Sequence, residues 1–237
     1  FSISGAANIT IRHLRFRYAD DDCFRIVGAC RNILIENCSF THGGDGAFDI
    51  TLDYKNPADR PTGITVRNCL IAATEKAMLV GGCDHLTLER NLYTNNGQRS
   101  PQLQDVRNFN LINNHIRNFS IYGVAFVVVP GNVVGNLIPL SPLKPRRPDL
   151  ALVIDLKSGR PCKIYTTGNL GPKKRDPNQQ GTSRGTIGKL PSGILPVAQV
   201  SGSLAATVGA RPLDAIDRTL VAGKPSLKFR PSRTKDK

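Results

Sequence analysis

The chain has 237 residues and a formal net charge of +14, and it is rich in Gly (22) and Pro (16) while Trp is absent. This size and composition fit one turn-rich all-β domain, with or without an appendage. They exclude a transmembrane helix, because no run of about 18 apolar residues occurs. None of the six cysteines forms a Cys-x-x-Cys pair, which argues against a zinc site.

Six segments that alternate apolar and polar residues recur along the first 138 residues. Their first residues are 24, 31, 22, 23 and 23 positions apart. A repeat of this length predicts a solenoid, in which each coil packs only on its neighbours. The segments are Asn8–Phe16, Asn32–Phe40, Gly63–Ile71, His85–Tyr93, Asn108–Ile116 and Gly131–Ile138.

Each segment predicts two short strands that meet at a corner. In the first, Ile9 and Ile11 alternate with polar residues, and the phase then shifts to Leu14 and Phe16. No segment has a helical period long enough for a crossover helix, so successive coils are expected to pair in parallel. The sequence therefore predicts an all-β, single-stranded parallel β-helix with an irregular basic C-terminal extension.

Aligning the segments predicts two columns of residues at these corners. Asn is frequent in both columns, and it tolerates left-handed backbone and can form ladders of side-chain amides. We expect the Asn residues to be structural. The first column is His13, Asn37, Asn68, Arg90 and Asn113, and the second is Leu14, Cys38, Cys69, Asn91 and Asn114. Cys38 and Cys69 are expected to be small core residues, with a disulfide as the alternative.

The chain divides into three parts by composition. Residues 1–141 are predicted to form the β-helix coils, 142–222 a terminal coil with long loops, and 223–237 a disordered basic tail. Residues 142–237 hold 19 Lys and Arg against 6 Asp and Glu. This basic region is expected to be a solvated extension, and binding to nucleic acid or to an acidic polysaccharide are the alternatives. Residues 51–61 are an insertion between the second and third segments, and insertions in solenoids often collect on the binding face.

The sharpest local feature is Gly43–Ile50, which contains Asp45 and Asp49. Flanking glycines let the backbone approach a hard cation, and residues four apart share one face of a strand. This spacing suggests a calcium site. A solvated polar turn and a glycoside hydrolase that uses Asp45 and Asp49 are the alternatives. Residues 20–22, all Asp, are expected to form a solvated turn or to line the same groove.

Lys76 and Arg99 follow their own repeats at offsets comparable to that of Asp45. Residues one coil apart lie on neighbouring rungs, about 5 Å from each other. The proline after Ser100 favours an extended backbone there, which presents Arg99 from the edge of an ordered coil. Asp45, Lys76 and Arg99 are therefore expected to line one lateral groove.

Several motifs, in this order and spacing, resemble the pectate lyases of polysaccharide lyase family 1. The resemblance covers roughly residues 3–220. The motifs are Ile11–Phe16, Asn32–Phe40, Asp45–Ile50, Glu75–Gly81, Leu86–Asn91, Asn96–Pro101, Phe109–Asn114, Tyr165–Asn169 and Val208–Asp217.

This resemblance implies a right-handed β-helix that cleaves polygalacturonate, or a related uronate polymer, by calcium-assisted β-elimination. It implies that Asp45 is a calcium ligand, that Arg99 is the catalytic base and that Lys76 is a groove lysine that stabilises the developing charge. Asp49 is a further expected metal ligand because of its spacing from Asp45. Asp84 is the other, as the one acidic residue that remains where the family has an acidic loop after Gly81. Gln104 stands where the family has a second, substrate-binding arginine.

The resemblance also implies an acidic polysaccharide as partner, Ca2+ as cofactor and a secreted or periplasmic bacterial protein. We expect a monomer, with no nucleic acid and no membrane as partner. No signal peptide is visible, and we expect that the N-terminus was removed or that the chain is a fragment. A non-catalytic β-helix that only binds polysaccharide is the rival hypothesis, which the neutral Gln104 favours.

Overall fold

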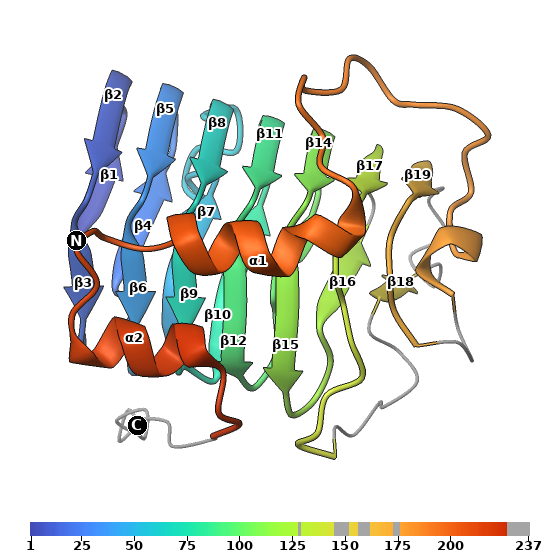
Figure 1. The fold of residues 1–237 in the computed structure, drawn as a ribbon. Coiled ribbons are helices and arrows are strands. Elements are labelled where there is room, and N and C mark those ends of the chain that lie inside the picture. The colour runs from blue at the N-terminus through green and yellow to red at the C-terminus, as the bar shows by residue number, and fades with distance from the viewer. Residues whose placement is uncertain (128, 145–151, 156–161, 173–175, 227–237) are drawn as a thin grey trace.

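A computed structural model describes the chain except residue 128 and residues 145–151, 156–161, 173–175 and 227–237. Its strands form three parallel sheets, and each complete coil contributes one strand to each sheet. This is the single-stranded parallel β-helix that the repeats predict (Figure 1). The tail predicted to be disordered lies outside the described residues from position 227 onwards.

We call the three sheets A, B and C. Sheet A contains β1 (Ser2–Ser4), β4 (Phe24–Val27), β7 (Gly46–Thr51), β10 (Lys76–Gly81), β13 (Gln102–Gln104), β16 (Val124–Val127) and β18 (Leu152–Asp155). Sheet B contains β2 (Ala7–Arg12), β5 (Arg31–Glu36), β8 (Thr62–Arg67), β11 (Asp84–Glu89), β14 (Arg107–Ile112), β17 (Gly131–Val134) and β19 (Ile164–Thr167). Sheet C contains β3 (Arg15–Arg17), β6 (Ser39–Thr41), β9 (Leu70–Ala72), β12 (Leu92–Asn96) and β15 (His115–Phe119).

The predicted strand pair of each of the first five repeats corresponds to one strand of sheet B and one of sheet C, and the sixth repeat has β17 of sheet B and an isolated bridge between Leu137 and His115. Sheet A lies in the segments between the repeats, which the sequence analysis treats as connections. Strand β7 reads Gly-Ala-Phe-Asp-Ile-Thr, and five of its six residues are buried. Because small and buried residues also occupy positions on its outer side, the two-residue period is weak there.

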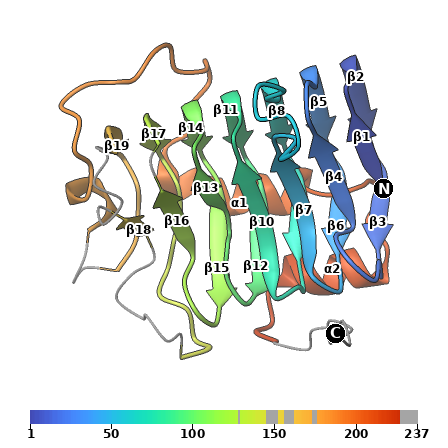
Figure 2. The same ribbon diagram turned by 180° about the vertical axis from the view of Figure 1, so that it is seen from behind.

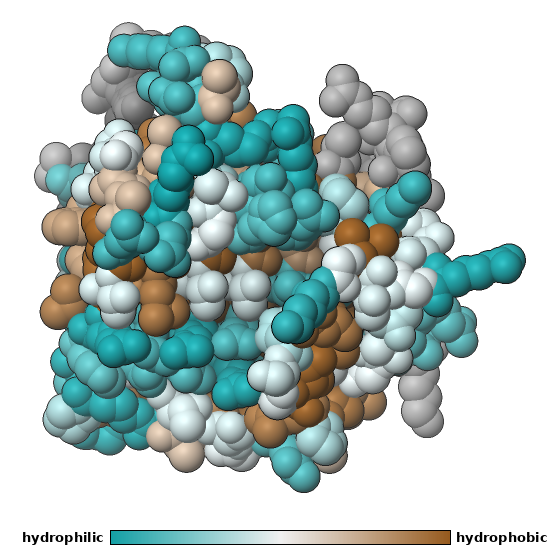
Figure 3. All heavy atoms as spheres, turned by 90° about the horizontal axis from the view of Figure 1, so that it is seen from above, coloured by the Kyte–Doolittle hydropathy of each residue, from teal (hydrophilic) through white to brown (hydrophobic). Residues whose placement is uncertain are grey.

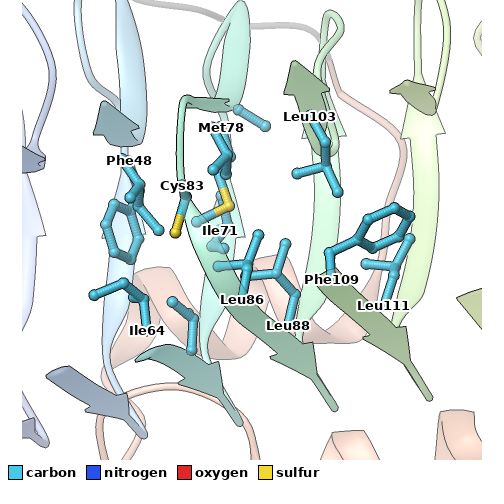
Figure 4. Packing of buried hydrophobic residues seen from close by; sticks show 14 of the residues in the cluster. Phe48, Ile64, Ile71, Met78, Cys83, Leu86, Leu88, Leu103, Phe109 and Leu111 are labelled. Atoms are coloured by element: carbon cyan, nitrogen blue, oxygen red, sulfur yellow. The ribbon is translucent and has the colours of Figure 1, made fainter. Parts of the chain in front are cut away.

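The inward side chains of all three sheets form one continuous core. Phe48, Met78, Leu103 and Phe109 point into the space between the sheets (Figure 4) and are at most 1% exposed. Burying side chains of this size contributes roughly 1.5–3 kcal/mol each. From above, most of the surface is hydrophilic or weakly polar, with hydrophobic side chains in smaller patches (Figure 3). All six cysteines are buried and free, so Cys38 and Cys69 are core residues as expected.

The corner between sheets B and C has the predicted left-handed column. His13, Asn37, Asn68, Arg90 and Asn113 have φ angles of 58°, 51°, 52°, 53° and 52°. Asn reaches this region at lower cost than most residues, which explains its frequency there.

The two asparagines of the second predicted column, Asn91 and Asn114, form an amide ladder that continues through Asn136 and Asn169. The Asn114 side chain donates to the carbonyl oxygen of Leu88 at 2.9 Å and to Asn136 Oδ1 at 3.0 Å. Its Oδ1 accepts the backbone N–H of Asn91 at 2.9 Å. The ladder thus satisfies backbone groups that the corner removes from the sheets.

The C-terminal extension contains more regular structure than the predicted irregular loops. After a short 3-10 helix, η2 (Pro177–Gln179), the chain forms α1 (Val197–Thr207) and α2 (Ala215–Ala222). Both helices pack on sheet C (Figure 1). Val200 and Leu204 of α1 are buried in one apolar cluster with Leu70 and Leu92 of the sheet. From behind, sheet A faces the viewer and the helices lie on the far side (Figure 2).

A buried ion-pair cluster holds α2 against the first two coils. The Asp217 carboxylate is fully buried and accepts hydrogen bonds from Arg15 Nε at 3.2 Å, from Arg17, and from Ser39 Oγ at 2.8 Å. Asp214 caps α2 through the N–H of Asp217 and pairs with Arg17, which holds the pKa of the Asp214 carboxyl well below its ordinary value. Residues some 200 positions apart in sequence are thereby joined.

Replacing Asn114 with Leu is expected to lower the free energy of unfolding by about 2–4 kcal/mol, because buried backbone groups at Asn91 and Leu88 lose their partners. The matched control is Asn32→Gly, which removes an exposed amide at a position whose left-handed φ of 52° suits glycine. Urea denaturation of both variants measures the difference. Equal losses in the two would contradict a special role for the buried ladder.

Replacing Asp217 with Ala is expected to destabilise the protein by about 3 kcal/mol, because two half-buried arginines lose a buried partner. Asp105→Ala breaks a more exposed pair with Arg60 and should cost below about 1 kcal/mol. Thermal unfolding compares the two. Limited proteolysis should also cut residues 208–226 faster in Asp217→Ala than in the wild type, and not in Asp105→Ala.

Candidate active site

Three carboxylates meet where the chain enters strands of sheet A. Single oxygens of Asp21, Asp22 and Asp45 all lie within 4.8 Å of one another. Asp21 and Asp22 precede β4, and Asp45 directly precedes β7, the neighbouring strand. The parallel pairing of β4 and β7 joins residues 24 positions apart and therefore brings Asp21 and Asp22 close to Asp45.

Asp22 is the most buried of these carboxylates, with a side chain only 6% exposed. Its Oδ1 has no hydrogen-bond partner, and its Oδ2 lies 3.7 Å from Arg25 Nε. The carboxylate rests against Gly46, where an added Cβ would clash with Oδ1. A glycine beside Asp45 thus provides the close approach that the sequence predicts at this position.

Asp49 adds a fourth carboxylate on the same sheet. It pairs in register with Arg25 and Leu79, and its Oδ1 accepts the Leu79 N–H at 2.9 Å. Burial raises the pKa of Asp49, while the Leu79 N–H and the charges of Arg99 and Arg25 act in the opposite direction. Burial also raises the pKa of Asp22 to about 7, with repulsion from Asp49, Asp21 and Asp45 adding to it.

Lys76 and Arg99 complete the group on the next two coils. Lys76 begins β10, opposite Gly46, and its Nζ forms an ion pair with Asp45 Oδ1. The backbone of Lys76 forms an isolated parallel β-bridge with Gln98, which places Arg99 on the next coil beside β10. Arg99 has a left-handed φ of 59°, its carbonyl oxygen accepts the Met78 N–H at 2.8 Å, and its Nε is buried without a hydrogen-bond partner.

The structure does not bring Asp84 to this group. Asp84 begins β11 of sheet B, where its Oδ1 accepts the backbone N–H of His85 at 2.9 Å. All of β10 separates Lys76 from this corner, which is about 16 Å at the usual rise per residue of a strand. The structure therefore does not bring Asp84 together with Asp45, because residues after β10 lie at the opposite edge of sheet A.

Gln104 lies on sheet A, but at the far end of its strand. It ends β13, and its Oε1 accepts a hydrogen bond from Gln102 Nε2 at 3.3 Å. It therefore lies on the same face as Asp49, toward the C-terminal edge of the sheet, and contributes no charge.

The sequence analysis gives Asp22 only as part of a turn that could line the groove. A usable signal was present, since Asp22 lies 23 residues before Asp45, close to the 24-residue spacing of the first two repeats, and Arg99 follows Lys76 by 23 residues. What the sequence does not show is burial, which makes Asp22 differ from the exposed Asp20 and Asp21.

The residues present fit a hard divalent cation. Carboxylate oxygens are the ligands that Ca2+ prefers, and four of them come from Asp21, Asp22, Asp45 and Asp49. Within the described residues, the closest basic partners are Arg25 and Lys76. The partnerless Oδ1 of Asp22 and the raised pKa of this group indicate negative charge that the protein itself leaves partly uncompensated.

Comparison with known proteins places the chain among β-helix proteins. The family model described as "Right handed beta helix region" matches residues 1–138, more than half of the chain. A Bacillus subtilis pectate lyase mutant shares 18% identity with a TM-score of 0.65, over 90% of this chain and 65% of its own. Pectate lyase from Bacillus sp. N165, solved with trigalacturonate, shares 16% identity with a TM-score of 0.69, over 86% and 68% of the two chains.

The sequence similarity to curated proteins is more local. Pectate lyase 4 of Ambrosia artemisiifolia is 28% identical over 115 residues, which are 45% of this chain and 27% of that protein. The chain thus spans about a quarter of the length of this relative and about two thirds of the Bacillus subtilis structure. Among the described residues, no helix is long and apolar enough to cross a membrane. The chain therefore belongs to the family of right-handed β-helix proteins, and the predicted resemblance to pectate lyases is confirmed at the level of the fold.

Proposed function

We propose that this protein is a polysaccharide lyase that cleaves polygalacturonate, or a related uronate polymer, by calcium-assisted β-elimination. The observation that carries the proposal is the convergence of Asp22, Asp45, Lys76 and Arg99 at one edge of sheet A. The fold shared with pectate lyases, one of them solved with trigalacturonate, supports an acidic polysaccharide as substrate. Secretion is part of the proposal, because such polymers lie outside the cell.

In this proposal Asp22, Asp45 and Asp49 hold calcium, with Asp21 as a further exposed carboxylate. When bound, the cation attracts the substrate carboxylate and makes the proton on the adjacent C5 more acidic. Asp45 has to turn from Lys76 toward the cation, which frees the Lys76 ammonium. Lys76 then neutralises the negative charge that develops as the C5 proton leaves.

Arg99 is the base in this proposal. It removes the C5 proton, the electron pair of that bond forms the C4=C5 double bond, and the C4–O bond breaks. The departing oxygen takes a proton from water, so the products are a new chain end and a 4,5-unsaturated sugar. A guanidinium is ordinarily protonated. The role of base is therefore taken from the resemblance to pectate lyases, and the structure adds that the Nε of Arg99 is buried without a hydrogen-bond partner.

The proposal predicts ultraviolet-absorbing, unsaturated products from polygalacturonate with calcium and none in chelator. Arg99→Ala should lower the rate by roughly 100-fold or more, the usual contribution of a general base. The control is Arg107→Ala, an exposed arginine that begins β14 on sheet B. New reducing ends without absorbance would favour the hydrolase alternative at Asp45 and Asp49. Calcium-independent binding without cleavage would favour the non-catalytic module.

The raised pKa of Asp22 predicts how stability depends on pH and calcium. Between about pH 4 and 7 the folded protein keeps a proton on Asp22 that the unfolded chain releases, because the pKa moves from 3.8 to about 7. Raising the pH through this window therefore destabilises the calcium-free protein. Asp22→Asn should accordingly raise Tm by several degrees at pH 8 in chelator.

Calcium should make the wild type, rather than Asp22→Asn, the more stable protein at pH 8. It should raise the Tm of the wild type at pH 8, and raise it much less at pH 5, where calcium competes with protons for Asp22. It should leave the Tm of Asp22→Asn unchanged. Scanning calorimetry at the two pH values, with calcium and with chelator, measures all four cases. A calcium-induced rise in Tm that survives in Asp22→Asn would contradict the assignment of this ligand.

A further inference from the structure

The outer face of sheet A differs in charge between its two edges. Charged side chains occupy the edge where strands β4, β7 and β10 begin. At the edge where strands end, Thr51, Gly81 and Gln104 pair in register and are followed by Val127. None of these four outward positions carries a charge.

The insertion at residues 51–61 forms an ordered wall beside this uncharged edge. Leu52 N donates to the Gly81 carbonyl oxygen at 2.8 Å, which fixes the start of the loop to β10. Arg60 fixes its end, since its guanidinium donates to the Asp105 carbonyl oxygen at 2.6 Å and to the Asp105 carboxylate at 2.7 Å. Asn56 and Asp59 tie the loop internally at 2.8 Å.

This wall presents Tyr54 above Gly81. Tyr54 is 68% exposed, the highest value among the large hydrophobic side chains of the described residues. A Cβ added at Gly81 would lie 3.4 Å from the Tyr54 hydroxyl and 3.7 Å from Gln104 Nε2. The hydroxyl and the amide therefore both lie over the backbone of Gly81, where a Thr51 methyl group lies 3.8 Å from the same Cβ position.

A chain of hydrogen bonds orients the Gln104 amide. The Tyr122 hydroxyl donates to Gln102 Oε1 at 2.7 Å, and Gln102 Nε2 donates to Gln104 Oε1 at 3.3 Å. This leaves Gln104 Nε2 as the donor that faces Gly81. A neutral amide donor, a phenol hydroxyl and an exposed aromatic ring are the groups that recognise a sugar ring by its hydroxyls and its apolar face.

We propose that Tyr54, Gly81 and Gln104 form a subsite for an uncharged sugar unit at the opposite edge of sheet A from the carboxylate cluster, about 16 Å from Lys76 along β10 at the usual rise per residue of a strand. This inference rests on the proposed function and narrows its substrate class. The preferred polymer carries free uronate at the cation and an uncharged unit, a methyl ester or a neutral sugar, over Gly81. A free carboxylate over Gly81 would lose water without gaining a charged partner, which is unfavourable.

The nearby charges of the insertion do not supply that partner. Arg60 is paired with Asp105, and the Asp53 carboxylate accepts the Lys55 N–H at 2.9 Å. Lys55 is exposed and is the one cation of this loop that could reach a uronate instead. Lys55→Ala is therefore the control that shows whether the subsite binds an uncharged unit or a uronate paired with Lys55.

The test measures binding without turnover, using the Arg99→Ala protein and isothermal titration in calcium buffer. The probes are galacturonate oligomers that are fully de-esterified or partly methyl-esterified, and an oligomer that alternates galacturonate with a neutral sugar. The two probes that contain uncharged units should bind about tenfold more tightly than the de-esterified one. Adding Tyr54→Ala should remove this advantage, and adding Gln104→Arg should reverse it.

Tyr165→Ala on sheet B and Lys55→Ala are the matched controls, and both should leave the preference unchanged. Tightest binding of the de-esterified oligomer, with loss on Lys55→Ala, would overturn the inference, as would equal effects of Tyr54→Ala and Tyr165→Ala. A Tyr54-dependent preference in a protein without lyase activity would refute the proposed reaction alone. Lyase activity with no effect of Tyr54 would refute the subsite alone.

Discussion

Parallel pairing of equivalent residues on successive coils is the constraint on which the rest of this structure depends. Each coil buries few residues, and it is stable only because the same positions of the next coil continue its core and its hydrogen bonds. The partly buried Phe16 and the buried Phe40 therefore stack in register, with ring centroids 5.3 Å apart. At the corners, where backbone pairing ends, the amides of Asn91 and Asn114 continue it through side chains.

The same pairing builds the candidate site. Side chains that are about one repeat apart in sequence become neighbours on adjacent rungs. Acidic or basic residues from successive coils therefore form a row along the sheet. Asp22 and Asp45 form such a row, and Lys76 and Arg99 extend it with opposite charge. A solenoid can thus place carboxylate, ammonium and guanidinium groups at one edge of a sheet without any long-range loop. The cost is electrostatic, since buried like charges raise the pKa of Asp22 until a proton or a cation relieves them.

The C-terminal helices and the insertion act on different faces of the solenoid. Helices α1 and α2 pack on sheet C, and the buried Asp217 joins α2 to Arg15 and Arg17 of the first coil. The insertion at residues 51–61 instead stands beside sheet A and is held by Arg60. One face is therefore used for stability, while the opposite one carries the carboxylates and the exposed Tyr54.

The sequence by itself determined the repeat, the parallel pairing and the left-handed corner column, because these follow from local alternation and from the backbone preferences of Asn. It also indicated that Asp45, Lys76 and Arg99 lie on neighbouring coils, since they share an offset from the repeat. It did not show that the segments between repeats form sheet A, because small buried residues hide the alternation in strands such as β7. Helices α1 and α2 were missed because both are short and depend on packing against sheet C. Helix α2 was missed although Asp214 and Gly223, which cap it, are good capping residues. Only the tertiary structure decided that Asp22 belongs to the site and Asp84 does not. Burial and the edge of the sheet on which a side chain lies depend on contacts between coils, which no local pattern encodes.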